Sequence, residues 1–561
     1  MPMAAFDHRK YRPFRPIGLK DRTWPDQVIT SAPAWCSVDL RDGNQALIEP
    51  MNVAQKLQMF EMLVRVGFKQ IEIGFPAASG PDFDFCRRLI DGGLIPDDVT
   101  VQVLTQARPE LIERSFEALV GAKRAIMHLY NSTSTVQREQ VFGLDRAGIT
   151  AIATEGARLV KQFAARHPTT EWTFQYSPES FTGTEIDYAV EICNAVIDVW
   201  QPTPARPCII NLPSTVEMAT PNIYADQIEW FCRHVSRRDS IVVSLHTHND
   251  RGCAVAAAEL AVMAGADRVE GTLLGNGERT GNMDIVTMAM NLYSQGIDPQ
   301  LDFSRMDEII RCVTACTQLP VHPRHPYAGD LVFTAFSGSH QDAIKKCLAR
   351  RAAGDPWEVA YLPIDPSDLG RSYQEVIRIN SQSGKGGVAY VLEQQAGFEL
   401  PRWLQIDFSG VVQKYAEVTA TEVEPSRIVE LFERHYLGQR TPYELAGYQV
   451  TREHDEDRLV ATLRHGAATL TLQGKASGVV GAFVNALEQH SGKRLVLIEY
   501  SEHTLSSSAG AGADAVAYVQ INVDGQRYCG VGRSSDIVEA SLRAILSAVN
   551  QQTGVAPGIA A

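Results

Sequence analysis

Residues 241–276 read IVVSLHTHNDRGCAVAAAELAVMAGADRVEGTLLGN. A β-rich run at 241–249 is followed by a helix-period stretch at 254–266 and by a second β-rich run at 268–276. Two β-rich runs separated by one helix are typical of a parallel β-α-β unit. This stretch therefore predicts a parallel sheet with helices on its surface.

The same alternation extends outward from this unit over residues 30–305. Eight β-rich runs occur, at 35–43, 68–76, 99–107, 124–132, 172–180, 208–216, 241–249 and 268–276. Eight strand–helix units in roughly 275 residues are typical of a closed (β/α)8 barrel. An open doubly wound sheet is the main alternative, but no GxGxxG turn follows the first run. We therefore expect an α/β fold with a (β/α)8 TIM barrel.

Polar side chains gather at the carboxyl ends of these runs. The ends carry Arg41-Asp42, Glu72, Gln106, His128 and Tyr130, Ser177 and Glu179, Ser214-Thr215, His246 and His248, and Asn276. In a barrel all these ends meet at one rim, where barrel enzymes have their active sites. An inert scaffold has no physical reason to concentrate polar groups there, so we expect an active site at this rim.

The pattern changes after residue 305. We expect an N-terminal arm (1–30), the barrel (31–305), a mostly helical linker region (306–436) and a C-terminal α+β domain (437–561). The C-terminal domain contains two weakly similar units, which predicts a domain of two related halves.

Each predicted half pairs a strand with a helix. The first half has a strand at 467–474 and a helix at 482–489, and the second has a strand at 515–523, a turn at Gly530–Gly532 and a helix at 536–550. We expect a flexible loop at 506–512 and a frayed tail after residue 551.

Composition excludes several classes of protein. The chain has 561 residues, 52 Lys+Arg and 66 Asp+Glu, a net charge of −14, and 45% hydrophobic residues. These values exclude a disordered or collagen-like chain, and the acidic balance argues against nucleic acid as a partner.

No apolar run approaches the roughly 18 to 20 residues of a membrane span, and the N-terminus is no secretory signal. The ten scattered cysteines, without a CxxC pair, indicate reduced thiols in a cytoplasmic protein.

The strongest chemical signal is Leu245-His-Thr-His-Asn-Asp250. Side chains two apart on a strand share a face, so His246 and His248 point the same way. Two imidazoles suit a divalent metal, and Asp42 and Asn282 can complete the set because strands one and eight are neighbours in a barrel. Ordinary hydrogen bonding is the alternative for the two histidines.

His322-Pro-Arg-His325 is predicted to be a loop rather than a second metal site, since its prolines exclude a helix.

Other rim residues suggest roles in binding or proton transfer. Arg41 supplies a planar donor fork for a carboxylate or an enolate oxygen, unless it only pairs with Asp42. The glycines of 275–282 either form a tight turn or let backbone amides approach an anion. Glu179 is a candidate acid or base. Taken singly, His128, Tyr130, Ser177 and Thr215 are as well explained by structural hydrogen bonds.

Four motifs together resemble the 2-isopropylmalate synthase family, in its longer subfamily. They are LRDGNQ (40–45), EIGFP (72–76), HTHND (246–250) and GNGERTGN (275–282). The resemblance continues through 368–373 and 380–387 to the paired C-terminal half-domains. One departure is Ala256-Ala-Ala-Glu259, where much of the wider group carries an Asn.

The resemblance implies a reaction and a set of roles. Acetyl-CoA is condensed with 3-methyl-2-oxobutanoate, and thioester hydrolysis gives 2-isopropylmalate and CoA. Asp42, His246, His248 and Asn282 would bind a divalent metal, Mg²⁺ by the subfamily resemblance, although Mn²⁺ and Zn²⁺ also suit the ligands. Arg41 would stabilise the oxyanion, Thr215 would bind the substrate carboxylate, and His128, Tyr130, Ser177 and Glu179 would shape the pocket.

The resemblance also implies partners and regulation. His340 and Tyr373 would reach the partner's barrel in a domain-swapped homodimer, with His340 as a hypothetical proton-abstracting base. The C-terminal domain would bind leucine and regulate the barrel. The alternatives are a citramalate or homocitrate synthase, a metal-dependent aldolase or lyase on the same barrel, and an inactive amino-acid-binding protein.

Overall fold

The computed structural model describes residues 8–335, 337–371, 385–419, 423–505 and 514–552. Two compact units emerge from the contacts within the chain. The first contains residues 1–332 and 366–371, and the second contains residues 333–365 and 372–561. The domain boundaries expected at residues 30, 305 and 436 stay predictions.

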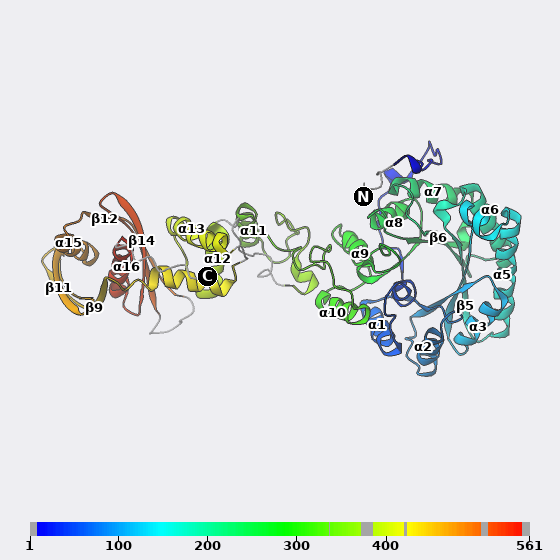
Figure 1. Cartoon of the computed structure of the whole chain (residues 1–561), viewed down its shortest axis with the longest axis horizontal. Helices are drawn as coiled ribbons and strands as arrows, with labels where there is room; N and C mark the ends of the chain where they lie inside the picture. Colours follow the sequence, from blue (N-terminus) through cyan, green and yellow to red (C-terminus); the bar gives the residue numbers. More distant parts are fainter. Residues whose placement is uncertain (1–7, 336, 372–384, 420–422, 506–513, 553–561) are drawn as a thin grey trace, which may run out of the picture. The chain divides into compact units, whose positions relative to one another are not determined.

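The first unit is a closed barrel of eight parallel strands, which confirms the predicted fold (Figure 1). The strands are β1 (Ala34–Ser37), β2 (Gln70–Gly74), β3 (Thr100–Gln106), β4 (Arg124–Ser132), β5 (Glu171–Glu179), β6 (Cys208–Ser214), β7 (Ile241–Thr247) and β8 (Arg268–Gly271). Each overlaps its predicted run. The barrel closes where β1 pairs with β8, with Cys36 opposite Glu270.

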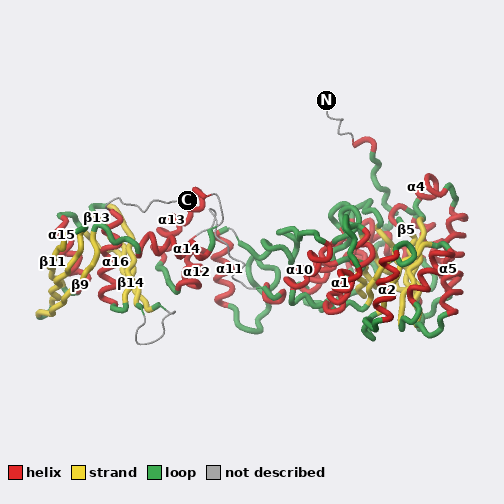
Figure 2. Tube along the Cα trace, turned by 60° about the horizontal axis from the view of Figure 1, so that its bottom comes forward, coloured by secondary structure: helices red, strands yellow, loops and turns green. Residues whose placement is uncertain are grey.

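Helices surround the strands, as Figure 2 shows in red around yellow. They are α1 (Val53–Val66), α2 (Gly80–Asp91), α3 (Pro109–Leu119), α4 (Thr135–Gln137), α5 (Arg146–Arg166), α6 (Ile186–Trp200), α7 (Pro221–His234), α8 (Ala254–Met263) and α9 (Ile285–Tyr293). Their bounds follow from local chemistry. In α1, Asn52 and Gln55 form a reciprocal cap at the start, and Gly67 ends the helix with φ +114°.

Six of the eight strands are shorter than predicted, β1 and β8 most of all. β1 ends at Ser37, and Asp39–Gly43 forms a π-helical turn that carries Arg41 and Asp42. β8 ends at Gly271, because the backbone of Met283 crosses there and leaves only 2.5 Å between its carbonyl oxygen and the place of a Cβ. The buried Asp39 carboxylate accepts a hydrogen bond from Leu273 N, 3.1 Å away, and so connects the two strand ends.

Helices follow the barrel, as predicted. They are α10 (Met306–Thr317), α11 (Gly338–Arg350), α12 (Lys385–Ala396), α13 (Arg402–Thr419) and α14 (Pro425–Phe432). His322 and His325 lie in a loop, as expected from the prolines beside them. Among the described helices, none is long and apolar enough to cross a membrane. All ten cysteines are free thiols.

The C-terminal domain consists of two halves, each with a three-stranded antiparallel sheet and one helix. The first half contains β9 (Tyr443–Glu453), β10 (Glu456–His465), β11 (Ala468–Ala476) and α15 (Val479–Ser491). The second contains β12 (Leu495–Thr504), β13 (Ala515–Val523), β14 (Gln526–Ser534) and α16 (Ile537–Gln552). The predicted strands and helices are confirmed, but β9, β10, β12 and β14 were not predicted.

The prediction of a turn at Gly530–Gly532 was wrong, because these residues lie inside β14. The flexible loop expected at 506–512 and the tail after 552 lie outside the described residues, as do the first four residues of the glycine-rich stretch 381–387.

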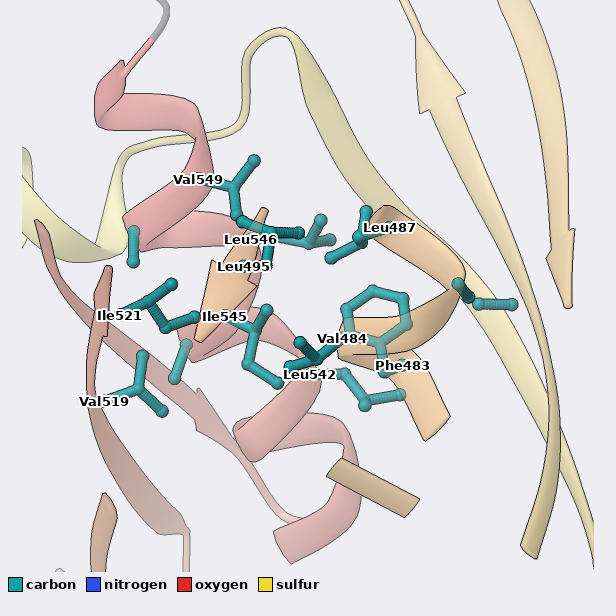
Figure 3. Packing of buried hydrophobic residues seen from close by; sticks show 14 of the residues in the cluster. Phe483, Val484, Leu487, Leu495, Val519, Ile521, Leu542, Ile545, Leu546 and Val549 are labelled. Atoms are coloured by element: carbon teal, nitrogen blue, oxygen red, sulfur yellow. The ribbon is translucent and has the colours of Figure 1, made fainter. Parts of the chain in front are cut away.

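One hydrophobic core fills the C-terminal domain, and both halves contribute to it. Figure 3 shows Phe483 and Leu487 of α15 facing Ile545 of α16 and Ile521 of β13. Glycines let each helix lie directly on its sheet. A Cβ on Gly474 would lie 2.0 Å from the carbonyl oxygen of Ala482 in α15.

Gly530 occupies the corresponding place in the second half. A Cβ there would lie 2.1 Å from the Ala544 carbonyl oxygen and 2.6 Å from Ala548 N, both backbone atoms that no rotamer change can move. We expect Gly530→Ala to lower the free energy of unfolding by about 3 kcal/mol, as for a severe overpacking substitution. The measurement is urea unfolding followed by circular dichroism. Gly410→Ala is the control, because a Cβ on Gly410, inside α13, meets nothing within 4 Å. Unchanged stability of Gly530→Ala would contradict the packing.

Candidate active site and metal centre

The carboxyl ends of the strands surround a cavity of about 370 Å³. Nine of the predicted site residues line it: Arg41, Asp42, His128, Tyr130, Ser177, Glu179, Thr215, His246 and His248. They come from the carboxyl ends of β1, β4, β5, β6 and β7 or from the residues just after them, as predicted. The cavity is therefore a binding site built by many loops on one rigid barrel.

Three of these side chains converge on one point. Oδ2 of Asp42 lies 2.9 Å from Nε2 of His246 and 3.2 Å from Nε2 of His248, and the two Nε2 atoms are 3.1 Å apart. All three residues are buried. A carboxylate oxygen and two ring nitrogens at this spacing are a suitable donor set for a divalent cation.

The second nitrogen of each imidazole fixes the ring. Nδ1 of His246 is 2.9 Å from Oε2 of Glu270, and Nδ1 of His248 is 2.9 Å from the carbonyl oxygen of Thr215. Both oxygens are acceptors, so with a metal bound each Nδ1 would donate to its oxygen and each Nε2 would present its lone pair to the metal. This is the arrangement that metal-binding histidines have in proteins.

Asn282 is the predicted fourth ligand. Its backbone pairs with that of His248, and its Nδ2 donates to the carbonyl oxygen of Asn276 at 3.0 Å. Its Oδ1 is buried and has no hydrogen-bond partner. Because a buried acceptor without a partner is costly, this oxygen indicates a missing ligand. The residues present therefore fit a divalent metal.

The charges of the centre depend on one another. Burial by itself would raise the pKa of Asp42, but Arg41 and the two imidazoles hold that pKa well below its ordinary value. Burial likewise opposes a charge on His246, yet Asp42 and Glu270 raise its pKa to about 9. The carboxylates thus concentrate negative charge at the point where a cation would bind.

Arg41 pairs mainly with a residue that the sequence did not single out as its partner. Its Nε donates to Oε2 of Glu72 at 2.6 Å, whereas Nη1 is 3.6 Å from Asp42. Burial disfavours the guanidinium charge, but Glu72 and Asp42 outweigh it and raise the pKa of Arg41. Arg41 is therefore a permanent, positioned cation at the mouth of the cavity.

His128 and Ser177 belong to a hydrogen-bonded group on the cavity wall. Nδ1 of His128 is 2.8 Å from Oε1 of Glu72, and its Nε2 is 2.7 Å from Oγ of Ser177. Nδ2 of Asn211 donates to the same Oγ at 3.0 Å. Tyr130 accepts a hydrogen bond from Gln106 at 2.8 Å. These bonds hold the wall in one arrangement.

Glu179 and Thr215 lie on neighbouring loops. Oγ of Ser132 donates to the Glu179 carboxylate, and the backbone N of Ser180 donates to Oγ1 of Thr215 at 2.9 Å. The hydroxyl of Thr215 therefore still has its own proton to donate into the cavity.

The remaining two predicted residues are placed differently. His340 lies on α11 in the second unit, where its ring stacks on Tyr361 at 3.8 Å between centroids. Tyr373 lies outside the described residues. Their roles stay predictions.

Sequence reasoning missed a layer of polar residues inside the barrel, below the cavity. Gln102, Arg268 and Glu270 are all buried there. Nη1 of Arg268 donates to Oε1 of Glu270 at 2.7 Å, and Nη2 donates to Gln102 at 2.9 Å. The available signal was Gln102 between two valines in TVQVL (100–104), and Arg268 and Glu270 on either side of Val269 in RVEG (268–271).

Removal of Arg268 leaves Glu270 buried without its principal cation. We expect Arg268→Met to lower the free energy of unfolding by about 3–5 kcal/mol, the usual cost of breaking a buried ion pair. The control is Arg238→Met, which removes a partly exposed pair with Asp267 (2.8 Å) and should cost about 1 kcal/mol or less. Both values come from urea unfolding at neutral pH. Equal losses in the two variants would contradict the importance of the interior layer.

Comparison with known proteins agrees with this architecture. Residues 32–313 match the HMGL-like family model, residues 330–393 match the alpha-isopropylmalate synthase post-catalytic domain-like model, and residues 422–553 match the LeuA allosteric (dimerisation) domain model. The three models together account for most of the chain.

Relatives named 2-isopropylmalate synthase match almost from end to end. The protein of Rhodospirillum rubrum is 57% identical over 97% of this chain and 98% of its own length. That of Parafrankia sp. is 58% identical over 97% of both chains, and that of Azotobacter vinelandii is 56% identical over 99% of both. This confirms the resemblance seen in the sequence motifs. The chain belongs to the 2-isopropylmalate synthase family.

Proposed function

We propose that this chain condenses acetyl-CoA with 3-methyl-2-oxobutanoate and hydrolyses the thioester, giving 2-isopropylmalate and CoA. It is an acyltransferase of leucine biosynthesis. The observation that supports this most is the rim cavity with its buried Asp42, His246 and His248, in a chain whose relatives carry the synthase name along their full length.

A divalent metal is held by Asp42, His246, His248 and Asn282, and Mg²⁺ is proposed by the resemblance to the longer subfamily. When bound, the metal supplies Lewis-acid polarisation of the ketone and carboxylate oxygens of the oxo acid. The Arg41 guanidinium donates to the oxygen that becomes negative, and the hydroxyl of Thr215 donates to the substrate carboxylate.

The condensation needs one proton to leave the acetyl methyl group. The resulting enolate carbon attacks the ketone carbon, the ketone oxygen takes up a proton, and water then cleaves the thioester. Glu179 lies in the cavity near the place proposed for the acetyl group. His340, from the partner chain of a domain-swapped homodimer, is proposed as the base that takes the methyl proton, and Tyr373 is proposed as a further catalytic residue of that chain. The match to a dimerisation domain supports a dimer.

The cavity wall favours a branched, apolar oxo acid. Its apolar side chains are Phe75, Leu104, Tyr130 and Pro213. The second carboxylate of 2-oxoglutarate would need a cation of its own. Of the two arginines in the wall, Arg41 is proposed for the oxygen that becomes negative, and Arg279 binds Asp250. Pyruvate would leave the apolar wall unfilled. These contacts favour 3-methyl-2-oxobutanoate over the substrates of homocitrate and citramalate synthases.

The reaction is tested by release of the CoA thiol from acetyl-CoA in the presence of different 2-oxo acids. We expect release with 3-methyl-2-oxobutanoate far above release with pyruvate or 2-oxoglutarate. EDTA should abolish it, and Mg²⁺ or Mn²⁺ should restore it, because the donor set holds the metal that polarises the ketone. Release with another oxo acid would keep the reaction but assign a different substrate. No release with any oxo acid would contradict the condensation and favour a lyase.

Leucine is proposed as the regulatory ligand of the C-terminal domain. A cavity of about 600 Å³ lies between the two halves, lined by Leu445 of β9, Arg533 of β14, and Glu539 and Leu546 of α16. Arg533 and Glu539 pair with Asp514 and Arg543, which also line this cavity. Leucine would place its carboxylate and ammonium groups among these charges and its isobutyl group against Leu445 and Leu546. Binding there would act on the barrel through a coupling free energy.

A chain that lacks residues 437–561 tests this regulation. We expect any CoA release that the shortened chain keeps to be insensitive to leucine, because the ligand site is gone. The measurement is CoA release at increasing leucine concentration, with the full chain as reference. Unchanged inhibition of the shortened chain would refute a regulatory site in the C-terminal domain.

A further inference from the structure

Arg279 lies in the loop between β8 and α9, three residues before Asn282. Its φ is +56°, a left-handed conformation that arginine rarely adopts. Its guanidinium donates twice to Asp250 in the loop after β7, from Nε to Oδ1 at 2.6 Å and from Nη2 to Oδ2 at 3.0 Å. Such a double contact fixes orientation as well as distance.

The same guanidinium also reaches the loop after β6. Nη2 donates to the carbonyl oxygen of Thr215 at 2.5 Å and lies 2.7 Å from Nδ1 of His248. The Thr215 carbonyl is also the acceptor for Nδ1 of His248, at 2.9 Å. Arg279 therefore contacts the oxygen that orients one of the proposed metal ligands.

Asp250 extends this contact network. Its Oδ2 accepts a hydrogen bond from the backbone N of Glu217 at 2.9 Å, and the Glu217 carboxylate accepts one from the backbone N of Arg251 at 2.5 Å. The backbone also connects the loops, since Asn249 N donates to the carbonyl oxygen of Gly281 at 2.9 Å. The loops after β6, β7 and β8 thus meet at the pair of Arg279 and Asp250.

We propose that Arg279 is a positioning residue that holds Thr215, His248 and Asn282 in their places around the metal. One side chain connects the three loops that carry these groups. The left-handed backbone at Arg279 supports this, because strained conformations persist where surrounding contacts require them. The inference rests on the proposed metal centre. An ordinary surface ion pair would leave metal affinity unchanged, which makes the two explanations separable.

The test compares Arg279→Gly, Arg279→Lys and Arg237→Gly in the full chain. Glycine adopts the left-handed backbone without strain, so Arg279→Gly removes the side chain without straining the loop. Lysine keeps the charge but has no planar fork to reach Asp250 and Thr215 together. Arg237 is the matched control, because it is an exposed arginine with φ +53° at the amino end of β7, bonded to Gln201 at 2.7 Å.

Mn²⁺ affinity of the metal-free protein, measured by calorimetry, is the first readout, and the KM for 3-methyl-2-oxobutanoate is the second. We expect both Arg279 variants to weaken Mn²⁺ binding roughly tenfold or more, as is usual when a group that orients a ligand is lost. The KM should rise in parallel, and Arg237→Gly should stay within about twofold of the original chain. Wild-type Mn²⁺ affinity and KM in Arg279→Gly would overturn the inference. Failure of the unchanged protein to bind Mn²⁺ would overturn the metal centre and the inference together.

Asp250→Asn provides an independent test, because it keeps the shape of the side chain and removes its charge. If the two residues act as one connection, the double variant Arg279→Gly/Asp250→Asn binds Mn²⁺ no more weakly than Arg279→Gly alone. If the two losses multiply, the residues act separately and the proposal is wrong. Thermal unfolding of each variant shows whether the barrel is intact.

Discussion

Two buried carboxylates inside the barrel, those of Glu270 and Glu72, each accept hydrogen bonds through both of their oxygens. Oε1 of Glu270 accepts from Arg268 at 2.7 Å, and its Oε2 holds Nδ1 of His246 at 2.9 Å. Glu72 accepts from Gln102 through Oε1 at 3.0 Å and from Arg41 through Oε2 at 2.6 Å. Glu270 therefore joins Arg268 inside the barrel to His246 at the rim, and Glu72 joins Gln102 inside to Arg41 and His128 at the rim. The positions of the imidazole and the guanidinium depend on this buried layer, because an unpaired carboxylate at this depth is very costly.

The layer also explains how an acidic centre stays ordered. Arg268 holds the pKa of Glu270 well below its ordinary value, and Arg41 does the same for Asp42, although burial acts in the opposite direction in both cases. Negative charge is thereby fixed at defined atoms before any ligand arrives. Preorganised charge of this kind needs no rearrangement during the reaction. The barrel thus supplies the electrostatics, and the rim loops supply the groups that touch substrate.

Much of the fold was predictable from local pattern. The runs with polar carboxyl ends predicted all eight barrel strands. The spacing of His246 and His248, two residues apart on one strand, predicted that they share a face, and closure of strand eight onto strand one predicted that Asp42 lies near them. Partners across the barrel were not predictable. Glu72 and Glu270 each follow an apolar residue in their strands. Their partners depend on the pairing register of the strands and on side-chain rotamers, which no local pattern contains. Strands β9 and β12 were missed because most of their side chains are exposed or half-exposed, so they lack an apolar run.

The core shared by the two C-terminal halves bears on the origin of that domain. Neither half can bury its helix and the inner face of its sheet without the other, since Phe483 and Leu487 pack in one cluster with Ile521 and Ile545. An ancestor with a single copy would have been stable only as a pair of chains. Joining two copies in one polypeptide makes their association intramolecular, and the effective concentration of each half for the other rises to the millimolar range for a short connection. Within one chain the two halves need not be identical, so the surfaces that they present can differ.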